Sequence, residues 1–87
     1  MSQIQELHQQ AMNLAEMAQV AKLRGDLPLA SQLSRQAFEQ ERSAAELIAG
    51  DLAAEPTRSV LHRSAATLGI DCGEIHTAER LIAIALS

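Results

Sequence analysis

The sequence predicts an all-α protein made of two antiparallel helical hairpins, and two observations support that fold class. Long stretches without glycine or proline carry apolar residues at spacings of three and four, as on one face of a helix. Two segments, starting at Gly25 and Gly73, also share a skeleton of glycine, acid and aliphatic residue, with small residues five and twelve positions after the glycine. Because glycine ends a helix and an acid caps the next one, each segment indicates a tight turn between two helices.

The first helix is expected at about residues 2–24. Ser2 is suited to the N-cap, and Gly25 can take the left-handed conformation that closes a helix. The predicted inward stripe consists of Ile4, Leu7, Ala11, Leu14, Ala15, Ala18 and Ala21.

The second helix is expected at about residues 27–49. Asp26 is its predicted N-cap, Pro28 fits the first turn, and Gly50 ends the helix. The predicted inward residues are Ala30, Leu33, Ala37, Phe38, Ala44, Ala45 and Ile48. The pairs Arg35/Glu39 and Arg42/Glu46 have the spacing of exposed ion pairs along one helix.

The third and fourth helices are expected at about residues 56–72 and 75–86. Pro56 suits a first helical turn, and Glu74 is the predicted cap of the last helix. The predicted inward residues of the third helix are Val60, Leu61, Ala65, Leu68 and Cys72. Residues 1–87 thus form a single domain, since 87 residues suffice for one small core.

Composition limits the classes of partner and compartment. The net charge of −4 argues against binding to nucleic acid or to an anionic membrane surface. A single cysteine excludes an intramolecular disulfide and fits a reducing compartment. The N-terminus lacks a secretory signal pattern, and the longest apolar run, Leu81 to Leu86, is too short to span a membrane. We therefore expect a cytoplasmic protein.

Catalytic, metal and cofactor motifs are not found in the sequence. The three histidines and Cys72 show no CxxC or HExxH spacing, and we expect surface histidines and a small buried thiol. Glu39 and Glu41 are expected on a solvated face of the second helix. The prediction is a non-enzymatic protein without catalytic residues, metal or cofactor.

The repeated skeleton resembles the tetratricopeptide repeat over about residues 11–87. The matching residues are Gly25, Asp26, Leu27, Ala30 and Ala37, and then Gly73, Glu74, Ile75, Ala78 and Ala85. The two copies are 48 residues apart, whereas repeats of the family recur about every 34 residues. Residues 56–87 are also similar to a segment of small, uncharacterised bacterial proteins found mainly in cyanobacteria. The alternative fold within the same class is an alanine-rich four-helix bundle.

Two functions follow as expectations, both without enzymatic activity. The first is self-association as a homodimer, through the overhang of the longer hairpin or through the apolar last helix. The residues expected at that contact are Ile4, Leu7, Leu47, Ile48, Leu81 and Ile84. The alternative is an adaptor or regulatory protein that binds a peptide, because the resemblance implies a peptide-binding inner face on the first and third helices. The residues expected there are Gln19, Lys22, Arg63 and Thr67.

Overall fold

The computed structural model describes residues 2–86 and consists of helices joined by short turns. The elements are α1 (Gln3–Leu23), α2 (Leu27–Ile48), a short 3-10 helix η1 (Leu52–Ala54), α3 (Thr57–Asp71) and α4 (Ile75–Leu86). Residues 2–86 contain no strand. The all-α prediction is confirmed, and every predicted helix boundary lies within one residue of the observed one.

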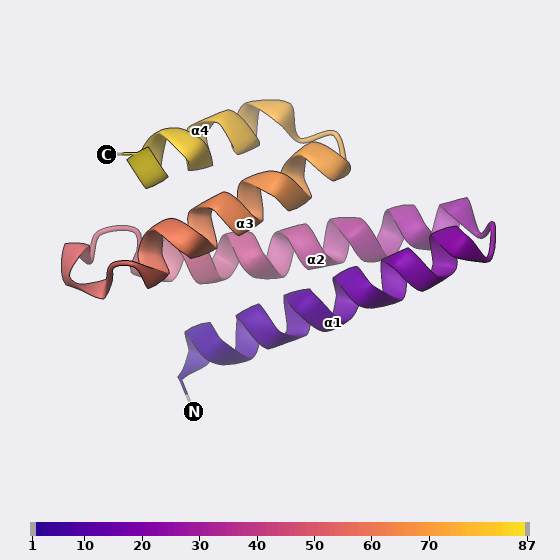
Figure 1. Cartoon of the computed structure of the whole chain (residues 1–87), viewed down its shortest axis with the longest axis horizontal. Coiled ribbons are helices and arrows are strands. Elements are labelled where there is room, and N and C mark those ends of the chain that lie inside the picture. The colour runs from indigo at the N-terminus through magenta and orange to yellow at the C-terminus, as the bar shows by residue number, and fades with distance from the viewer. Residues whose placement is uncertain (1, 87) are drawn as a thin grey trace.

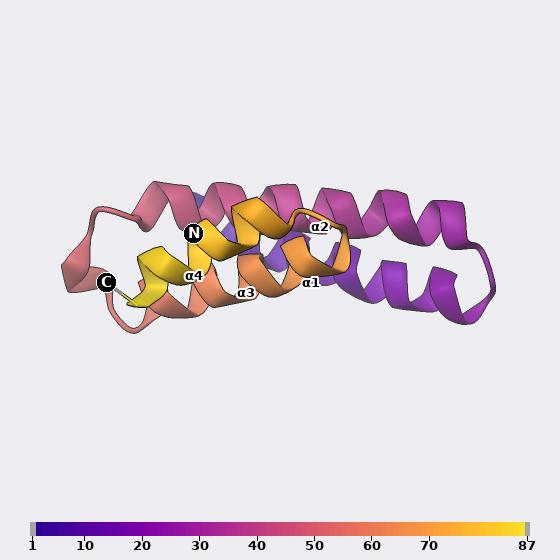
Figure 2. The same ribbon diagram turned by 90° about the horizontal axis from the view of Figure 1, so that it is seen from above.

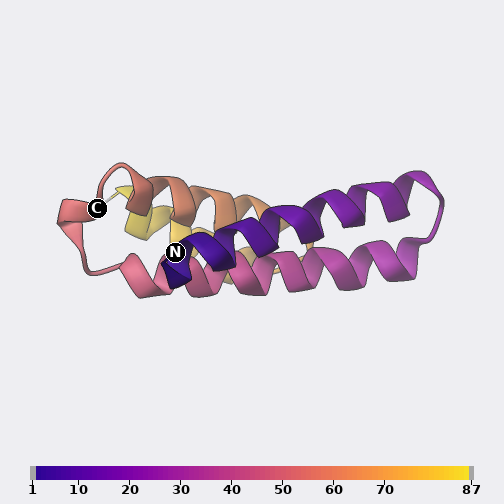
Figure 3. The same cartoon turned by 90° about the horizontal axis from the view of Figure 1, so that it is seen from below.

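The helices follow one another side by side, each running opposite to the one before (Figure 1). The Cα trace extends 42 × 30 × 14 Å, which makes the molecule a thin slab. In the two turned views, α2 lies along one side of this slab, and α1 and α3 lie along the other (Figures 2 and 3). Since α2 packs against both α1 and α3, it is the central element of the fold.

The first turn is built by the residues that the sequence singled out. Gly25 has a φ of +82°, a left-handed value that costs little only for glycine. The Asp26 carboxylate accepts a hydrogen bond of 3.2 Å from the backbone N–H of Leu29, which caps α2. At the other end of α1, Ser2 and Gln5 form a reciprocal capping box. The chain therefore reverses at Gly25 as predicted.

The second turn reverses at Gly73, whose φ is +85°, and Glu74, the residue before α4, also contacts another helix. The Glu74 carboxylate pairs with Arg35 of α2, with 2.8 Å between Oε1 and Nη1. Arg35 Nη2 also donates a hydrogen bond of 3.1 Å to the backbone carbonyl of Cys72. Arg35 thus fastens the α3–α4 turn to α2 instead of pairing with Glu39.

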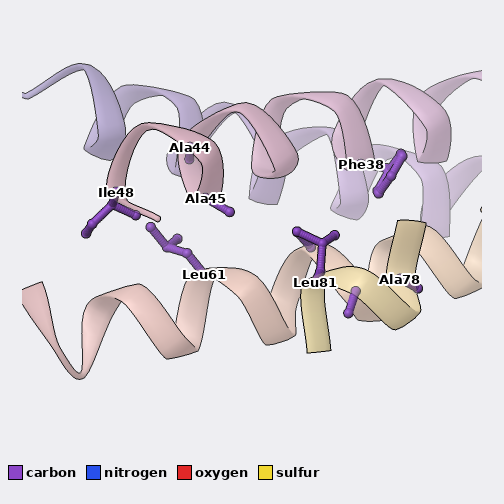
Figure 4. Packing of buried hydrophobic residues seen from close by; sticks show 9 residues of the cluster. Phe38, Ala44, Ala45, Ile48, Leu61, Ala78 and Leu81 are labelled. Carbon is purple, nitrogen blue, oxygen red and sulfur yellow. The ribbon is translucent and has the colours of Figure 1, made fainter. Parts of the chain in front are cut away.

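The main core lies between α2 and the α3–α4 hairpin (Figure 4). Its buried residues are Phe38, Ala44, Ala45, Ile48, Leu61, Ala65, Ala66, Ala78 and Leu81. Phe38, the single aromatic residue of the chain, is fully buried. A Cβ atom on Gly69 of α3 would lie 3.0 Å from the Phe38 ring, so glycine at this position lets α3 approach the ring closely.

A second, smaller core fills the end of the α1–α2 hairpin near the Gly25 turn. It contains Ala18, Ala21, Ala30 and Leu33, with Leu14 packed against it. All of these residues come from α1 and α2. This end of the hairpin is therefore held together by small side chains, without help from α3 or α4.

The overhang of the longer hairpin lies at the opposite end from the one predicted. The α3–α4 hairpin lies beside the end of α2, and the turn between α1 and α2 projects beyond it (Figure 1). The cause is the short link at residues 49–56, which makes α3 start where α2 ends. Ile4 and Leu7 consequently pack against the main core, and Ile48 belongs to it.

Candidate functional site

The projecting end of the α1–α2 hairpin exposes large apolar side chains on both helices. These are Met17, Val20, Leu23, Leu27 and Leu29, with exposed fractions between 42% and 87%. Scattered exposed apolar residues are normal on a protein surface, but five of them between residues 17 and 29, at one end of the molecule, are unusual. We therefore treat this end of the molecule as the candidate interaction site.

One face of the projecting end is hollowed between α1 and α2 into a groove of about 700 Å³, here called the outer groove. Its lining residues are Asn13, Glu16, Met17, Val20, Ala21, Arg24, Asp26, Leu29 and Leu33. All of them belong to α1, α2 or the turn between these helices. The outer groove has an apolar floor with charged residues around it, an arrangement that suits contact with another protein.

The other face forms a groove of about 530 Å³ beside the end of α3, here called the inner groove. Its lining residues are Ala15, Ala18, Gln19, Lys22, Leu27, Ala30, Ser31, Ser34, Leu68, Asp71 and Cys72. Two of the predicted peptide-binding residues, Gln19 and Lys22, therefore lie in one groove. Burial raises the pKa of the Cys72 thiol at its edge, which disfavours the reactive thiolate.

The other two predicted peptide-binding residues, Arg63 and Thr67, are exposed on α3 and do not line the inner groove. Both side chains bond to their own helix. Thr67 Oγ1 donates to the carbonyl of Arg63 at 3.0 Å, and Arg63 Nε donates to the carbonyl of Ser59 at 3.4 Å. The structure thus divides the predicted set of four residues into two pairs.

Most of the residues predicted for self-association are used inside the chain. Ile48 and Leu81 are 6% and 5% exposed in the main core, so they are not available to a second copy in this fold. Ile4, Leu7 and Ile84 are half-buried, and Leu47 is exposed. The end of the last helix was predicted to be apolar on every side, and the exposed large apolar residues of α4 are Ile75, Ile82 and Leu86.

A buried polar cluster joins three helices through Glu41, which was expected on a solvated face. Glu41 of α2 is fully buried and accepts hydrogen bonds from His8 of α1 and Ser64 of α3. His8 Nδ1 lies 2.9 Å from both carboxylate oxygens, and Ser64 Oγ lies 2.6 Å from Oε2. Because Ser64 donates to the carboxylate, this cluster lacks the serine-to-histidine bond of a hydrolase triad.

A second polar contact closes the end of α2 and corrects the prediction of a surface position for His62, whereas His76 is exposed as predicted. Arg58 of α3 is buried, and its Nε donates a hydrogen bond of 2.6 Å to the carbonyl of Ala49. His62, only 1% exposed, donates from Nδ1 to the carbonyl of Arg58 at 2.7 Å. A cation at the carboxyl end of a helix interacts favourably with the helix dipole, so Arg58 stabilises the junction of α2 and α3.

Within residues 2–86, no group of three histidine, cysteine, aspartate or glutamate side chains could hold a metal ion. None of the helices in this part of the chain combines the length and apolar character needed to cross a membrane. Comparison of the chain with protein-family models, curated protein sequences and solved structures found no significant match.

Proposed function

We propose that this protein is a non-enzymatic helical interaction module that binds a second copy of itself through the projecting end of the α1–α2 hairpin. The observation that carries the proposal is the uncovered apolar surface of that end, which includes Met17, Val20 and Leu29. Burial of such surface is worth roughly 25 cal/mol per Å², enough for a few side chains to drive association. We further propose that the protein is cytoplasmic and that its hairpins are tetratricopeptide-like.

Comparison of the two hairpins supports the proposal. At the offset of 48 residues, Met17, Val20 and Leu33 correspond to Ala65, Leu68 and Leu81. In the second hairpin these positions belong to the main core or pack against it, since this face of α3 and α4 rests on α2. The same face of the first hairpin has no helix over it within residues 2–86. An apolar surface of this kind is therefore suited to packing against another helix.

Replacing Met17 with lysine should convert the self-associated protein to a monomer at micromolar concentration. Leu47 provides a matched control, because it is also 53% exposed but lies at the other end of the hairpin. Leu47→Lys introduces the same charge and should leave the assembly intact. Sedimentation equilibrium gives the solution mass of the three proteins. A monomeric wild-type protein at high micromolar concentration would exclude self-association.

The inner groove supports a second candidate function, the binding of an extended peptide. Lys22 and Gln19 offer donors to peptide carbonyls or to an acidic side chain, and Asp71 of α3 lines the same groove. Shape and polar lining of this kind suit a peptide more than a flat protein surface.

Peptides selected from a random library by the wild-type protein should bind the Lys22→Glu variant about tenfold more weakly, the effect of one lost charged contact. Arg63→Glu, which changes a residue outside the groove, should bind them as the wild type does. Fluorescence anisotropy of labelled peptides measures both affinities. Equal loss in the two variants, or selection of no peptide, would remove this candidate.

A further inference from the structure

The exposed side of α1 carries a sequence pattern that is symmetric about Val20. Glu16 lies four residues before Val20 and Arg24 lies four residues after it. Met17 and Leu23 lie three residues before and three after. In a helix a step of four residues turns about 40° past a full turn and rises about 6 Å, so the two charges stand at equal distances above and below Val20.

The structure places Val20 and the two charged residues of this pattern on one surface. Glu16, Val20 and Arg24 all line the outer groove. Arg24 is the C-cap of α1 with φ −82° and ψ −4°, a right-handed backbone that continues the course of the helix. Val20 is 45% exposed between the two charged residues.

Neither charged side chain has a partner within residues 2–86. In this part of the chain Arg35 pairs with Glu74 and Arg42 with Glu46, and His8 contacts Glu41. The side chains of Glu16 and Arg24 form no hydrogen bond there either. About 12 Å of helix separates these two residues, which is too far for them to pair with each other. Their charges are therefore available to another molecule.

A second copy of the chain provides the complementary charges if its α1 runs antiparallel. A two-fold axis through Val20 exchanges the positions before and after it, as every two-fold contact must. Glu16 of each copy then meets Arg24 of the other. Parallel alignment of the same two helices would instead place Glu16 against Glu16 and Arg24 against Arg24.

We propose that two copies pair through the outer-groove face of α1 in an antiparallel, two-fold arrangement centred on Val20, with two Glu16–Arg24 ion pairs at its ends. This inference rests on the self-association proposed above and assigns its geometry. Leu29 of α2 forms part of the other wall of the groove and adds apolar surface beside the paired helices. The contact between α2 and the α3–α4 hairpin has the same design, an apolar centre beside the Arg35–Glu74 ion pair.

Charge reversal tests the arrangement. In Glu16→Lys the introduced lysine of each copy meets Arg24 of the other, and in Arg24→Glu the introduced glutamate meets Glu16. Each single variant should weaken dimerisation at least tenfold in sedimentation equilibrium at low salt, because two attractive pairs become repulsive. The double variant Glu16→Lys/Arg24→Glu restores both pairs and should dimerise like the wild type.

An equimolar mixture of the two single variants provides a sharper test. The lysine introduced into one copy would face the glutamate introduced into the other, and the unchanged Glu16 would face the unchanged Arg24. Both ion pairs therefore form only in the mixed dimer. Native mass spectrometry should show a heterodimer with a dissociation constant near that of the wild type. Both positions are exposed, and far-UV circular dichroism should show all variants equally helical.

A cysteine at the axis adds an independent measurement. In a chain with Cys72→Ser, the variant Val20→Cys should form a disulfide-linked dimer under mild oxidation, because the two introduced thiols meet at the axis. Gln32→Cys, at an exposed position outside the groove, should not. If both charge-reversal variants dimerise like the wild type, or if their mixture forms no heterodimer, this arrangement is wrong and the protein self-associates through another face. A monomeric wild-type protein would overturn both proposals.

Discussion

Replacing Phe38 with alanine should remove most of the folding stability of this protein. Truncation of a buried phenylalanine costs about 3–5 kcal/mol through lost burial and the cavity that remains. A chain of 87 residues has a total free energy of unfolding of roughly 4–13 kcal/mol. The remaining core consists largely of alanines, which are too small to close the cavity, so the expected cost lies in the upper part of the range.

Urea unfolding followed by far-UV circular dichroism measures this loss, since the chain has no tryptophan or tyrosine to report by fluorescence. Leu47→Ala is the control on the same helix, because Leu47 is 53% exposed and its truncation should cost less than about 1 kcal/mol. A loss below about 1.5 kcal/mol for Phe38→Ala would contradict the central role of the ring.

The turns and helix boundaries could be predicted because local chemistry determines them. Gly25 and Gly73 adopt the left-handed backbone that their positions suggested, and Asp26 caps α2 through its carboxylate. Glu74 shows the limit of such inference. Its partner, Arg35, is 39 residues away in the sequence, and only the packing of the second hairpin brings the two side chains together.

The prediction of which end of the longer hairpin overhangs was wrong, because the short link at residues 49–56 determines where α3 begins. A link of a few residues forces α3 to start beside the end of α2, where the start of α1 also packs on α2. Ile4 and Leu7 are therefore packed against the core, and the apolar residues near Gly25 are exposed instead. Val60, predicted to face inward, is 47% exposed, since the inward face of α3 is centred on Leu61 and Ala65.

The position of Glu41 in the sequence pattern indicates burial, but a glutamate is usually exposed, so a solvated position was predicted. Glu41 follows Ala37 by four residues and precedes Ala44 and Ala45 by three and four, so it lies on the buried stripe of α2. A charged residue on such a stripe needs a partner, and the sequence does not show which one. Only the fold brings in His8 and Ser64, from α1 and α3.

Replacing His8 with leucine should cost about 2–3 kcal/mol, because the Glu41 carboxyl group stays buried with one hydrogen-bond partner fewer. The side chain of His8 is 40% exposed, so water weakens its contact with Glu41 and keeps the cost below that of a fully buried contact. Leucine covers the carboxylate without hydrating it, and His8→Ala, which admits water, should therefore cost less. Urea unfolding of the two variants gives both values.

The combined variant His8→Leu/Glu41→Leu/Ser64→Ala separates two roles for the cluster. If Glu41 only requires partners, removing all three polar groups together should return the free energy of unfolding to within about 1 kcal/mol of the wild type, since apolar replacements of buried ion pairs are often neutral. A triple variant as unstable as His8→Leu alone would show that the shape of the polar cluster, which touches α1, α2 and α3, sets how these helices pack. In that case the projecting end, fixed by the position of α1 on α2, should also lose its capacity to self-associate.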